Sequence, residues 1–344
     1  MATEKSIVIA TRGSALALAQ ANLIAALGRA AFPQLNFELK IIKTTGDKMQ
    51  TASLASVGEK LPKGLFTKEL EVALLEGEAD LAVHSLKDLP TDLPDGLVLA
   101  ATPKREDVRD VLIYRDADFF TQHAARSTAA RGFAPHTKLK DFPQGATMAT
   151  SSPRRKMSLL AVRPDLNIVE IRGNVPTRLQ KISERGELDA TVLALAGLKR
   201  LGFEIETERG QLVRKLRDER TSRPRSDDGP PGLLATVLSL DEMLPCVGQG
   251  AIGIETRAND GRIVNIVARL NHADTFFCVT AERAFLRAMG GGCQSPVGAH
   301  AEISGGTISL KAISFRDETV KRGEGKRPIA EAAELGKQIA AELK

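Results

Sequence analysis

The chain has 344 residues, of which 42% are hydrophobic and 26% are charged, and its formal net charge is +5. These values are ordinary for globular proteins, so they exclude a disordered chain, and the length leaves room for two or three domains. No apolar run approaches the ~20 residues that a membrane-spanning helix needs, and a single Tyr without any Trp disfavours stacking on single-stranded nucleic acid. We expect a cytoplasmic multidomain protein that binds neither a membrane nor nucleic acid.

The first predicted element is a strand over 6–10, which ends at Thr11-Arg12-Gly13-Ser14 and leads into a helix over 15–30. Ser14 is a typical N-cap residue. A strand that enters a helix through a glycine turn leaves backbone N–H groups free, here beside Arg12. The turn therefore predicts an anion site, although an ordinary strand-to-helix connection explains the same pattern.

A long polar run over 44–64 follows a second strand, over 37–43. The run contains glycines and is rich in lysine, and it reaches almost to Lys68. Structureless loops longer than ~15 residues are usually functional or disordered. We interpret this run as a mobile basic lid.

A helix over 66–76 and a buried strand over 80–84 come next, and the strand ends at Ser85-Leu86-Lys87-Asp88-Leu89-Pro90. Open α/β sheets bind ligands at the carboxyl ends of their strands. Adjacent side chains on extended backbone point apart, so Lys87 need not pair with Asp88, and the carboxylate stays available for proton chemistry. A plain surface turn is the alternative.

A second unit is predicted from Arg105 onward, and several of its strands end in basic turns. Guanidinium groups bind carboxylates through two parallel hydrogen bonds, so such turns, together with Arg12, predict a pocket for a ligand that bears several carboxylates or phosphates. The strands run over 111–114, 148–150, 167–171 and 191–194, and the turns are Ser151-Ser152-Pro153-Arg154-Arg155, Arg172-Gly173-Asn174 with Arg178 one turn later, and Gly197-Leu198-Lys199-Arg200.

Two segments, 116–144 and 206–234, show no clear period, and we interpret both as mobile surface excursions. The arginines between 209 and 225 suggest nucleic-acid binding. Acidic residues interleave with them, however, so the sequence favours a solvated insertion.

The remaining chain is predicted as a strand over 251–255, helices over 261–270 and 274–288, strands over 297–301 and 308–314, and a helix over 329–343. The cysteines at 246, 278 and 293 form no CxxC pair and the histidines are scattered, so we expect no metal and no disulfide framework. Cys246 and Cys278 look structural. The glycine-rich stretch before Cys293 can present its thiol, although free cysteines are more often buried.

A series of motifs, in order along the chain, resembles the porphobilinogen deaminase family, also called hydroxymethylbilane synthase. The resemblance spans most of the chain apart from the two excursions, and it departs at Pro153, where the family usually has leucine, and at Gly290, where an acidic residue is common. The motifs lie at 10–12, 45–47, 63–70, 83–90, 105–107, 150–155, 172–174, 247–250, 281–284 and 291–293.

The resemblance implies an α/β fold of three domains and a monomer. Two related lobes, similar to periplasmic binding proteins and built on mixed sheets, would hold the active site between them. Lobe 1 would comprise 1–104 with 250–270 and carry Asp88, and lobe 2 would comprise 105–245 with the arginine turns. A small α+β domain over 272–344 would carry the cofactor-anchoring cysteine.

The resemblance also implies a transferase of tetrapyrrole biosynthesis, which leads to haem and chlorophyll. Members of the family condense four porphobilinogen molecules head to tail on a dipyrromethane cofactor, and they release ammonia and then, by hydrolysis, hydroxymethylbilane. The partners would be porphobilinogen and the growing polypyrrole chain, and an organellar location stays open if a transit segment was removed. The alternative is a non-catalytic two-lobed binding protein for a polycarboxylate small molecule.

By the same resemblance, Asp88 and Lys87 are the catalytic residues, and Cys293 holds the cofactor through a thioether. The residues that would bind the cofactor are Cys293, Arg12, Ser14, Lys68, Ser85, Lys87, Asp88, Thr150, Ser151, Ser152, Arg154, Arg155, Arg172 and Gly173. The residues that would bind the substrate are Arg12, Gln20, Phe66, Arg154, Arg172, Arg178 and Arg200.

Overall fold

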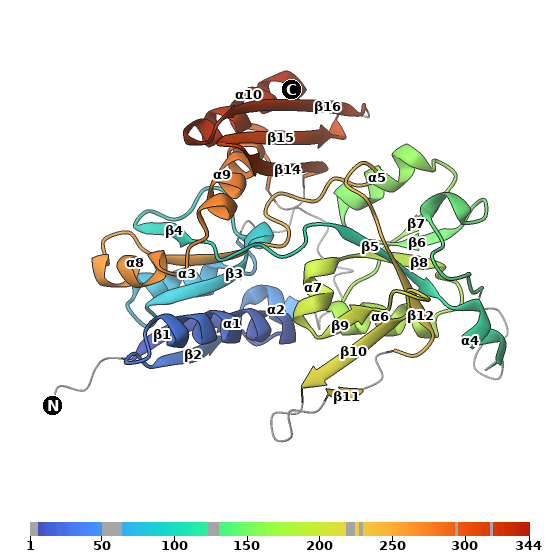
Figure 1. Ribbon diagram of the computed structural model, residues 1–344, viewed down its shortest axis with the longest axis horizontal. Helices are drawn as coiled ribbons and strands as arrows, with labels where there is room; N and C mark the ends of the chain where they lie inside the picture. Colours follow the sequence, from blue (N-terminus) through green and yellow to red (C-terminus); the bar gives the residue numbers. More distant parts are fainter. Residues whose placement is uncertain are drawn as a thin grey trace. The chain divides into compact units, whose positions relative to one another are not determined.

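The computed structural model describes residues 6–49, 64–122, 131–217, 224–226, 230–292, 295–316 and 319–344. The chain forms two compact units, which Figure 1 colours along the sequence. Unit 1 consists of Met1–Glu106, Cys246–Ser314 and Lys321–Lys344, and unit 2 of Asp107–Pro245 and Phe315–Val320. Most of the run over 44–64 lies outside the described residues, so its interpretation as a lid stays a prediction.

Unit 1 contains a five-stranded sheet in the order β2-β1-β3-β13-β4. β1, β2 and β3 are parallel, and β13 runs antiparallel to both of its neighbours. β13 follows unit 2 in the sequence, so the chain returns to unit 1 to fill the place between β3 and β4. The strands are β1 (Ile7–Arg12), β2 (Phe37–Ile42), β3 (Leu81–Ser85), β4 (Leu97–Ala101) and β13 (Ile252–Arg257).

Helices cover both faces of this sheet. α1 (Ala15–Ala31) and α8 (Gly261–Ala268) share one core with Ile7 and Ile9. α3 (Lys68–Leu75) packs on the opposite face, in a core that includes Ala10. Successive residues of a strand point to opposite faces, so the alternation along β1 produces this division. A short helix, α2 (Thr45–Met49), follows β2.

Unit 2 contains a second five-stranded sheet, in the order β12-β5-β8-β6-β7. β6, β7 and β8 are parallel, and β5 runs antiparallel to both of its neighbours. The strands are β5 (Asp110–Arg115), β6 (Thr147–Ala149), β7 (Asn167–Val169), β8 (Ala190–Ala194) and β12 (Leu233–Val237). The helices are α4 (Ala117–Gln122), α5 (Pro153–Val162), α6 (Val175–Glu184) and α7 (Leu195–Arg200), with a 3₁₀ turn, η4 (Leu139–Asp141).

The two five-stranded sheets share one plan: three parallel strands, then an antiparallel strand, then a strand of the original direction. β1, β2 and β3 of unit 1 therefore correspond to β6, β7 and β8 of unit 2. Parallel neighbours end at the same edge of a sheet, so the turns after β1 and β3 lie together in unit 1, and those after β6, β7 and β8 lie together in unit 2.

The interpretation of 116–144 and 206–234 as surface excursions is wrong for several of their described residues. Phe133 and Phe142 are buried and pack edge-on against Tyr114, with ring centroids 6.1 and 5.9 Å from that of the tyrosine. Leu233 and Leu234 are buried in β12, a strand of the main sheet. The same stretch also supplies β10 (Leu212–Arg217) and β11 (Pro224–Ser226), which form a small sheet in the order β11-β10-β9 with the preceding strand β9 (Phe203–Ile205).

The C-terminal region of unit 1 is a three-stranded antiparallel sheet, β14-β15-β16, whose buried residues share one core with α9 and α10. The mixed sheets and this small α+β region confirm the predicted α/β class. None of the helices in the described parts of the chain is long and apolar enough to cross a membrane. The elements are α9 (Ala273–Ala288), β14 (Val297–Ser304), β15 (Thr307–Ser314), β16 (Lys321–Pro328), the 3₁₀ turn η6 (Ile329–Glu331) and α10 (Ala332–Leu343).

Candidate active site

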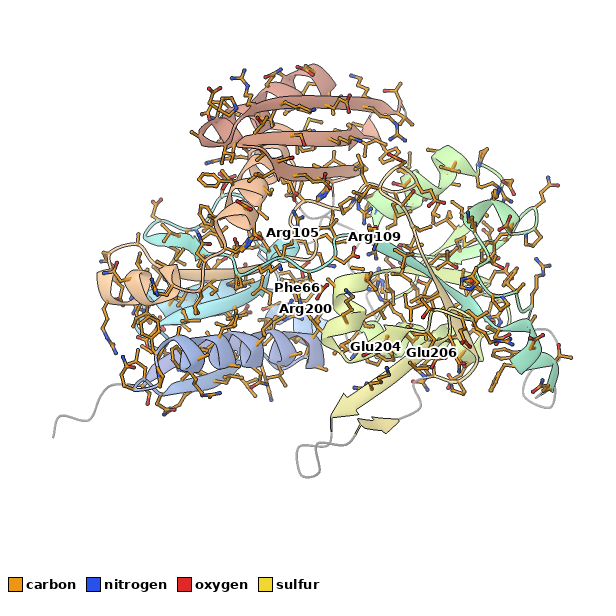
Figure 2. All side chains as sticks on the ribbon, viewed as in Figure 1. Phe66, Arg105, Arg109, Arg200, Glu204 and Glu206 are labelled. Atoms are coloured by element: carbon orange, nitrogen blue, oxygen red, sulfur yellow. The ribbon has the colours of Figure 1, made fainter. Side chains whose placement is uncertain are left out.

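A pocket of about 70 Å³ lies in unit 1 at the carboxyl ends of β1 and β3. Its walls come from β1, from the first turns of α1, from the residues before α3, and from β3 and the turn after it. The predicted site residues that line it are Arg12, Ser14, Gln20, Phe66, Ser85 and Asp88. Among these, Phe66 is labelled in Figure 2.

A buried side-chain amide links two of the elements that line the pocket, α1 and β3. Gln20, on α1, is 2% exposed, and its Nε2 donates a hydrogen bond of 2.9 Å to Ser85 Oγ at the end of β3. Ser14 is the N-cap of α1, and its Oγ accepts from the backbone N–H of Ala17 at 3.3 Å. These hydrogen bonds fix where α1 begins relative to the end of β3.

The guanidinium of Arg12 already has an acidic partner. Its Nε donates to both Asp47 oxygens, at 3.2 and 3.3 Å, and its Nη2 also contacts Asp47 Oδ1. The guanidinium carbon lies 4.2 Å from the centroid of the Phe66 ring. Burial opposes ionisation of Asp47, but hydrogen bonds from Arg12 and Thr44 and the charge of Arg12 hold its pKa below the usual value. A ligand carboxylate that binds Arg12 must therefore compete with Asp47.

Lys87 and Asp88 lie in a 3₁₀ turn, η2 (Leu86–Asp88), directly after β3. Leu86 is buried and packs with Leu89 and Val279, so the turn is fixed by its apolar residue. Both charged side chains are half-buried. Within the described residues, neither of them has a hydrogen-bond or ion-pair partner. The Asp88 carboxylate is therefore available to a ligand in the pocket.

In unit 2, the residues after β6 form a tightly bonded turn. Ser152 is the N-cap of α5, and its Oγ accepts from the N–H of Arg155 at 3.4 Å. Thr150 Oγ1 accepts from the N–H of Ser152 at 3.2 Å, and Ser151 Oγ donates to Ile171 O at 2.8 Å. Thr150, Ser151 and Ser152 are thus occupied in holding the turn between β6 and α5.

Arg154 and Arg155 are buried in ion pairs with Asp110 of β5. Arg154 Nη2 lies 2.8 Å from Asp110 Oδ2, and Arg155 Nη2 lies 2.7 Å from Oδ1. Arg154 Nη1 also donates to Leu244 O at 2.7 Å. Burial alone would raise the pKa of Asp110, but the two guanidiniums lower it to about 2. Both arginines serve the core of unit 2 in this structure.

Arg178 and Arg172 follow β7 and are differently placed. Arg178 Nε donates to Gly173 O at 2.8 Å, and among the described residues no carboxylate pairs with this side chain. Burial, with the nearby charge of Arg155, lowers the pKa of Arg178 to about 10. Gly173 has φ of +116°, a conformation that suits glycine. Arg172 is exposed and lies 3.2 Å from Glu170.

The remaining predicted residues are Arg200, Lys68 and Cys293. Arg200 ends α7, and Figure 2 labels it. Lys68 is exposed at the start of α3 and does not line the pocket. Cys293 lies outside the described residues, so its role as the cofactor anchor stays a prediction. The helix that precedes it, α9, ends at Ala288, and Met289 is its C-cap residue.

Three acidic residues of these surroundings were given no role from the sequence: Asp47, Asp110 and Glu282. Glu282, on α9, forms two hydrogen bonds with Arg105, of 2.6 and 2.9 Å, and also accepts from two backbone N–H groups, those of Gly248 and Ala301. Each acid lies far along the chain from its arginine. No local pattern could have identified these pairs.

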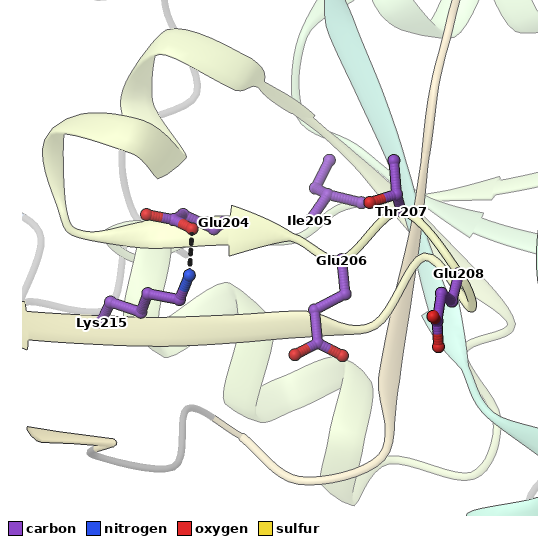
Figure 3. A pocket seen from close by; sticks show the side chains of 6 residues that line it. All are labelled: Glu204, Ile205, Glu206, Thr207, Glu208 and Lys215. Atoms are coloured by element: carbon purple, nitrogen blue, oxygen red, sulfur yellow. Dashed lines mark hydrogen bonds and ion pairs between the residues drawn. The ribbon is translucent and has the colours of Figure 1, made fainter. Parts of the chain in front are cut away.

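A larger groove of about 380 Å³ lies elsewhere in unit 2, on the β9–β10 hairpin (Figure 3). Its charged lining consists of Glu204, Glu206, Glu208 and Lys215, and Lys215 is paired with Glu204 at 2.7 Å. An acidic lining repels carboxylates. Although this groove is the larger, its chemistry and its lack of any predicted site residue favour the smaller pocket as the active site.

Comparison with known proteins gives one family. Residues 7–265 match the family described as "Porphobilinogen deaminase, dipyromethane cofactor binding domain", and residues 276–344 match "Porphobilinogen deaminase, C-terminal domain". A relative named porphobilinogen deaminase from Chloroherpeton thalassium is 43% identical over 344 residues, which cover 98% of this chain and 93% of the relative. Another of that name, from Chlorobium chlorochromatii, is 42% identical and covers 99% and 95%.

Solved structures are similar at much lower identity. The periplasmic aliphatic sulphonate binding protein from Escherichia coli is 12% identical with a TM-score of 0.39, over 83% of this chain and 71% of that one.

Proposed function

Because the chain belongs to the porphobilinogen deaminase family, we propose that it condenses four porphobilinogen molecules head to tail, releasing ammonia and then hydroxymethylbilane. We further propose that it holds a dipyrromethane cofactor through a thioether to Cys293. When bound, this cofactor supplies the pyrrole ring to which the first substrate is joined.

Two charged side chains that lack a partner of opposite charge among the described residues support a ligand of this kind. Arg178 carries a half-buried guanidinium that no described carboxylate neutralises. Asp88 is a half-buried carboxylate that no described cation or N–H group satisfies. A chain of pyrroles carries acetate and propionate groups as well as ring N–H groups, so it can supply both kinds of missing partner. The residues present therefore fit the cofactor and its substrate.

The observation that carries the proposal is the position of Asp88 in the pocket. Loss of ammonia from the aminomethyl group of porphobilinogen leaves an electron-poor ring, and forming the next carbon–carbon bond places positive charge on a pyrrole nitrogen. A carboxylate next to that nitrogen stabilises the charge and can accept the proton released afterwards. Asp88 shares the pocket with Arg12 and Ser85, which can orient the substrate.

The arginines divide by how readily they can bind a ligand. Arg172 and Arg178 can receive a carboxylate with little rearrangement, since one is exposed and the other has no acidic partner among the described residues. Arg12, Arg154 and Arg155 already hold Asp47 or Asp110. For these three, we propose that binding requires exchange of the acid for the ligand.

Intact-protein mass tests the cofactor. Wild-type protein from cells that make porphobilinogen should exceed its sequence mass by one dipyrromethane, and Cys293→Ser should lose that increment. Wild-type protein without the adduct would refute the assignment of Cys293.

Turnover tests the role of Asp88. Asp88→Asn should keep the fold and the adduct and lower kcat by about 100-fold or more, because the amide can neither balance the ring charge nor accept the proton. Asp95→Asn is the matched control, since Asp95 is exposed and does not line the pocket. Near-normal turnover by Asp88→Asn would show that another group handles the proton. Tight binding of porphobilinogen without consumption would instead favour the non-catalytic binding protein.

A further inference from the structure

One side of α9 lies against the segment that carries Asp88. Val279 is buried together with Leu86 and Leu89, the first and last residues of the stretch Leu86–Leu89, which we call the catalytic turn. One helical turn later, Arg283 Nη1 donates to Leu89 O at 3.1 Å and Nη2 donates to Pro90 O at 2.7 Å. Residues four apart lie on the same side of a helix, so the apolar contact and the guanidinium contact form a single stripe.

The backbone after Asp88 depends on this guanidinium. Leu89 and Pro90 belong to no helix or strand. The start of the turn is held by a backbone bond from Leu86 N–H to Ala251 O at 3.0 Å, and the turn is closed by one from Leu89 N–H to Leu86 O at 3.1 Å. Buried carbonyls of irregular backbone need a donor from a side chain, another backbone group or water. Arg283 supplies the donors here, and removing it leaves two carbonyls without these donors.

Arg283 sits in an environment that makes its contacts strong. Burial lowers its pKa to about 10, while the negative charges of Glu255 and Asp92 favour the charged form and Arg287 opposes it. A guanidinium remains charged at neutral pH even after such a shift. Hydrogen bonds from a charged donor are about twice as strong as neutral ones when water is kept away. The two hydrogen bonds from Arg283 to Leu89 O and Pro90 O, which we call the clamp, therefore hold the turn more firmly than an exposed ion pair would.

The same helix leads directly to the predicted anchor. After Met289, the N–H of Gly290 bonds to Arg287 O at 2.8 Å and that of Gly291 bonds to Leu286 O at 3.1 Å. With Gly290 at φ of +67°, this is a Schellman motif, which fixes the direction in which the chain leaves the helix. Arg283 therefore joins the catalytic turn to the helix from which the cysteine-bearing loop departs.

We propose that Arg283 is a positioning residue, which holds the carbonyls after Asp88 on α9 and so sets the place of the Asp88 carboxylate. This inference rests on the proposed function. It assigns no contact between Arg283 and the substrate.

The test compares Arg283→Met and Arg283→Lys with wild-type holoenzyme. In Arg283→Met, the N–H of Leu89 should exchange with deuterium about tenfold faster, because the turn opens locally. The kcat should fall roughly ten- to hundredfold with little change in KM, since the substrate still binds but the carboxylate is misplaced. Arg283→Lys should recover part of both quantities, because an ammonium can reach one of the carbonyls.

Arg287→Met is the matched control. Arg287 lies one turn further along α9 in an exposed pair with Asp92, and exposed pairs contribute little. Its exchange rates and kcat should stay close to wild type. If Arg283→Met does not fold, Arg283→Lys carries the comparison.

Unchanged exchange at Leu89 in the Arg283 variants would overturn the clamp, and faster exchange with normal kcat would overturn the positioning role. Arg283→Lys that recovers neither quantity would also count against it. Failure of the proposed function looks different: wild-type holoenzyme would consume no porphobilinogen, while the exchange comparison would still decide whether Arg283 holds the turn.

Discussion

Replacing Asp110 by asparagine should destabilise unit 2 strongly. The carboxylate is completely buried between Arg154 and Arg155, and it accepts 2.7 and 2.8 Å hydrogen bonds from them. Asparagine has nearly the same shape, so the packing is conserved. After the change, two buried guanidiniums face a neutral amide. The NH₂ group of that amide is a donor, so it cannot accept a hydrogen bond from either arginine.

The pKa of Asp110 sets the size of the effect. The folded-state pKa is about 2 against an ordinary value of 3.8, because the attraction of the two arginines outweighs burial. Such a lowering corresponds to roughly 2 kcal/mol of stability at neutral pH. Breaking a buried ion pair by removing one partner typically costs about 3–5 kcal/mol, so we expect Asp110→Asn to lower the free energy of unfolding by several kcal/mol.

Tyr114 provides the assay. It is the chain's single tyrosine, there is no tryptophan, and it lies fully buried on β5, the strand that begins with Asp110. Its hydroxyl and Thr236 Oγ1 are 2.8 Å apart. Tyrosine emission during urea unfolding therefore reports on unit 2, and the variant's midpoint should move to lower urea with an unchanged slope.

The pH dependence gives a second readout. A depressed carboxyl pKa contributes stability that is complete above the ordinary value of 3.8 and is lost as the pH falls towards about 2. The difference between wild type and Asp110→Asn should therefore shrink as the pH falls through that range. Asp118→Asn is the control, since Asp118 pairs with Arg209 on the surface of unit 2. A midpoint shift for Asp110→Asn no larger than that of Asp118→Asn would refute the reasoning.

Two further predictions concern α9 and the glycines that follow it. Gly290→Ala should lower stability by about 1 kcal/mol because an L-residue is strained at φ of +67°, whereas Gly292→Ala, in open space without a positive φ, should be near neutral in thermal unfolding. Burial raises the pKa of Cys278 to about 12, so at pH 8 its alkylation should be much slower than that of the half-buried Cys246 in peptide-mapped labelling. Equal rates in the native protein, rather than only in urea, would contradict the burial argument.

The strands and helices that the sequence predicted well are those whose burial imposes a clear period. The strand over 6–10 and the helix over 15–30 correspond to β1 and α1 within two residues at each end. The turns after these strands were also predictable, because an N-cap serine or a glycine acts through its immediate neighbours. For that reason, it could be anticipated that Arg12, Ser85 and Asp88 lie at the carboxyl ends of β1 and β3, where they line one pocket.

The partners of the arginines could not be anticipated. Arg12 is 35 residues from Asp47 in the sequence, and Arg155 is 45 residues from Asp110. Sequence patterns show which turns are basic. They do not show which acid the neighbouring strand brings beside each turn, so they overstate how many guanidiniums await a ligand.

β16 was missed because it lacks the side chains by which strands are recognised. Its sequence alternates charged residues with Gly323 and Gly325. Because β16 is an edge strand, it pairs with one strand only, β15. A Cβ at Gly323 would lie 3.3 Å from Ile339 and Leu343, and one at Gly325 would lie 3.0 Å from Ile339. The helix α10 therefore lies directly on the strand backbone, and the apolar contact is supplied entirely by the helix.

The place of β13 between β3 and β4 has a consequence for the order of folding. On the ribosome, β1 to β4 emerge first, but the strand that joins β3 to β4 follows only after the continuous segment Asp107–Pro245. Unit 2 can complete its sheet while the facing edges of β3 and β4 are still unpaired. Unpaired edges are templates for wrong pairing. The sheet of unit 1, whose first strands are translated first, is therefore completed last. We expect nascent chains that stop before residue 252 to be the ones that need chaperones.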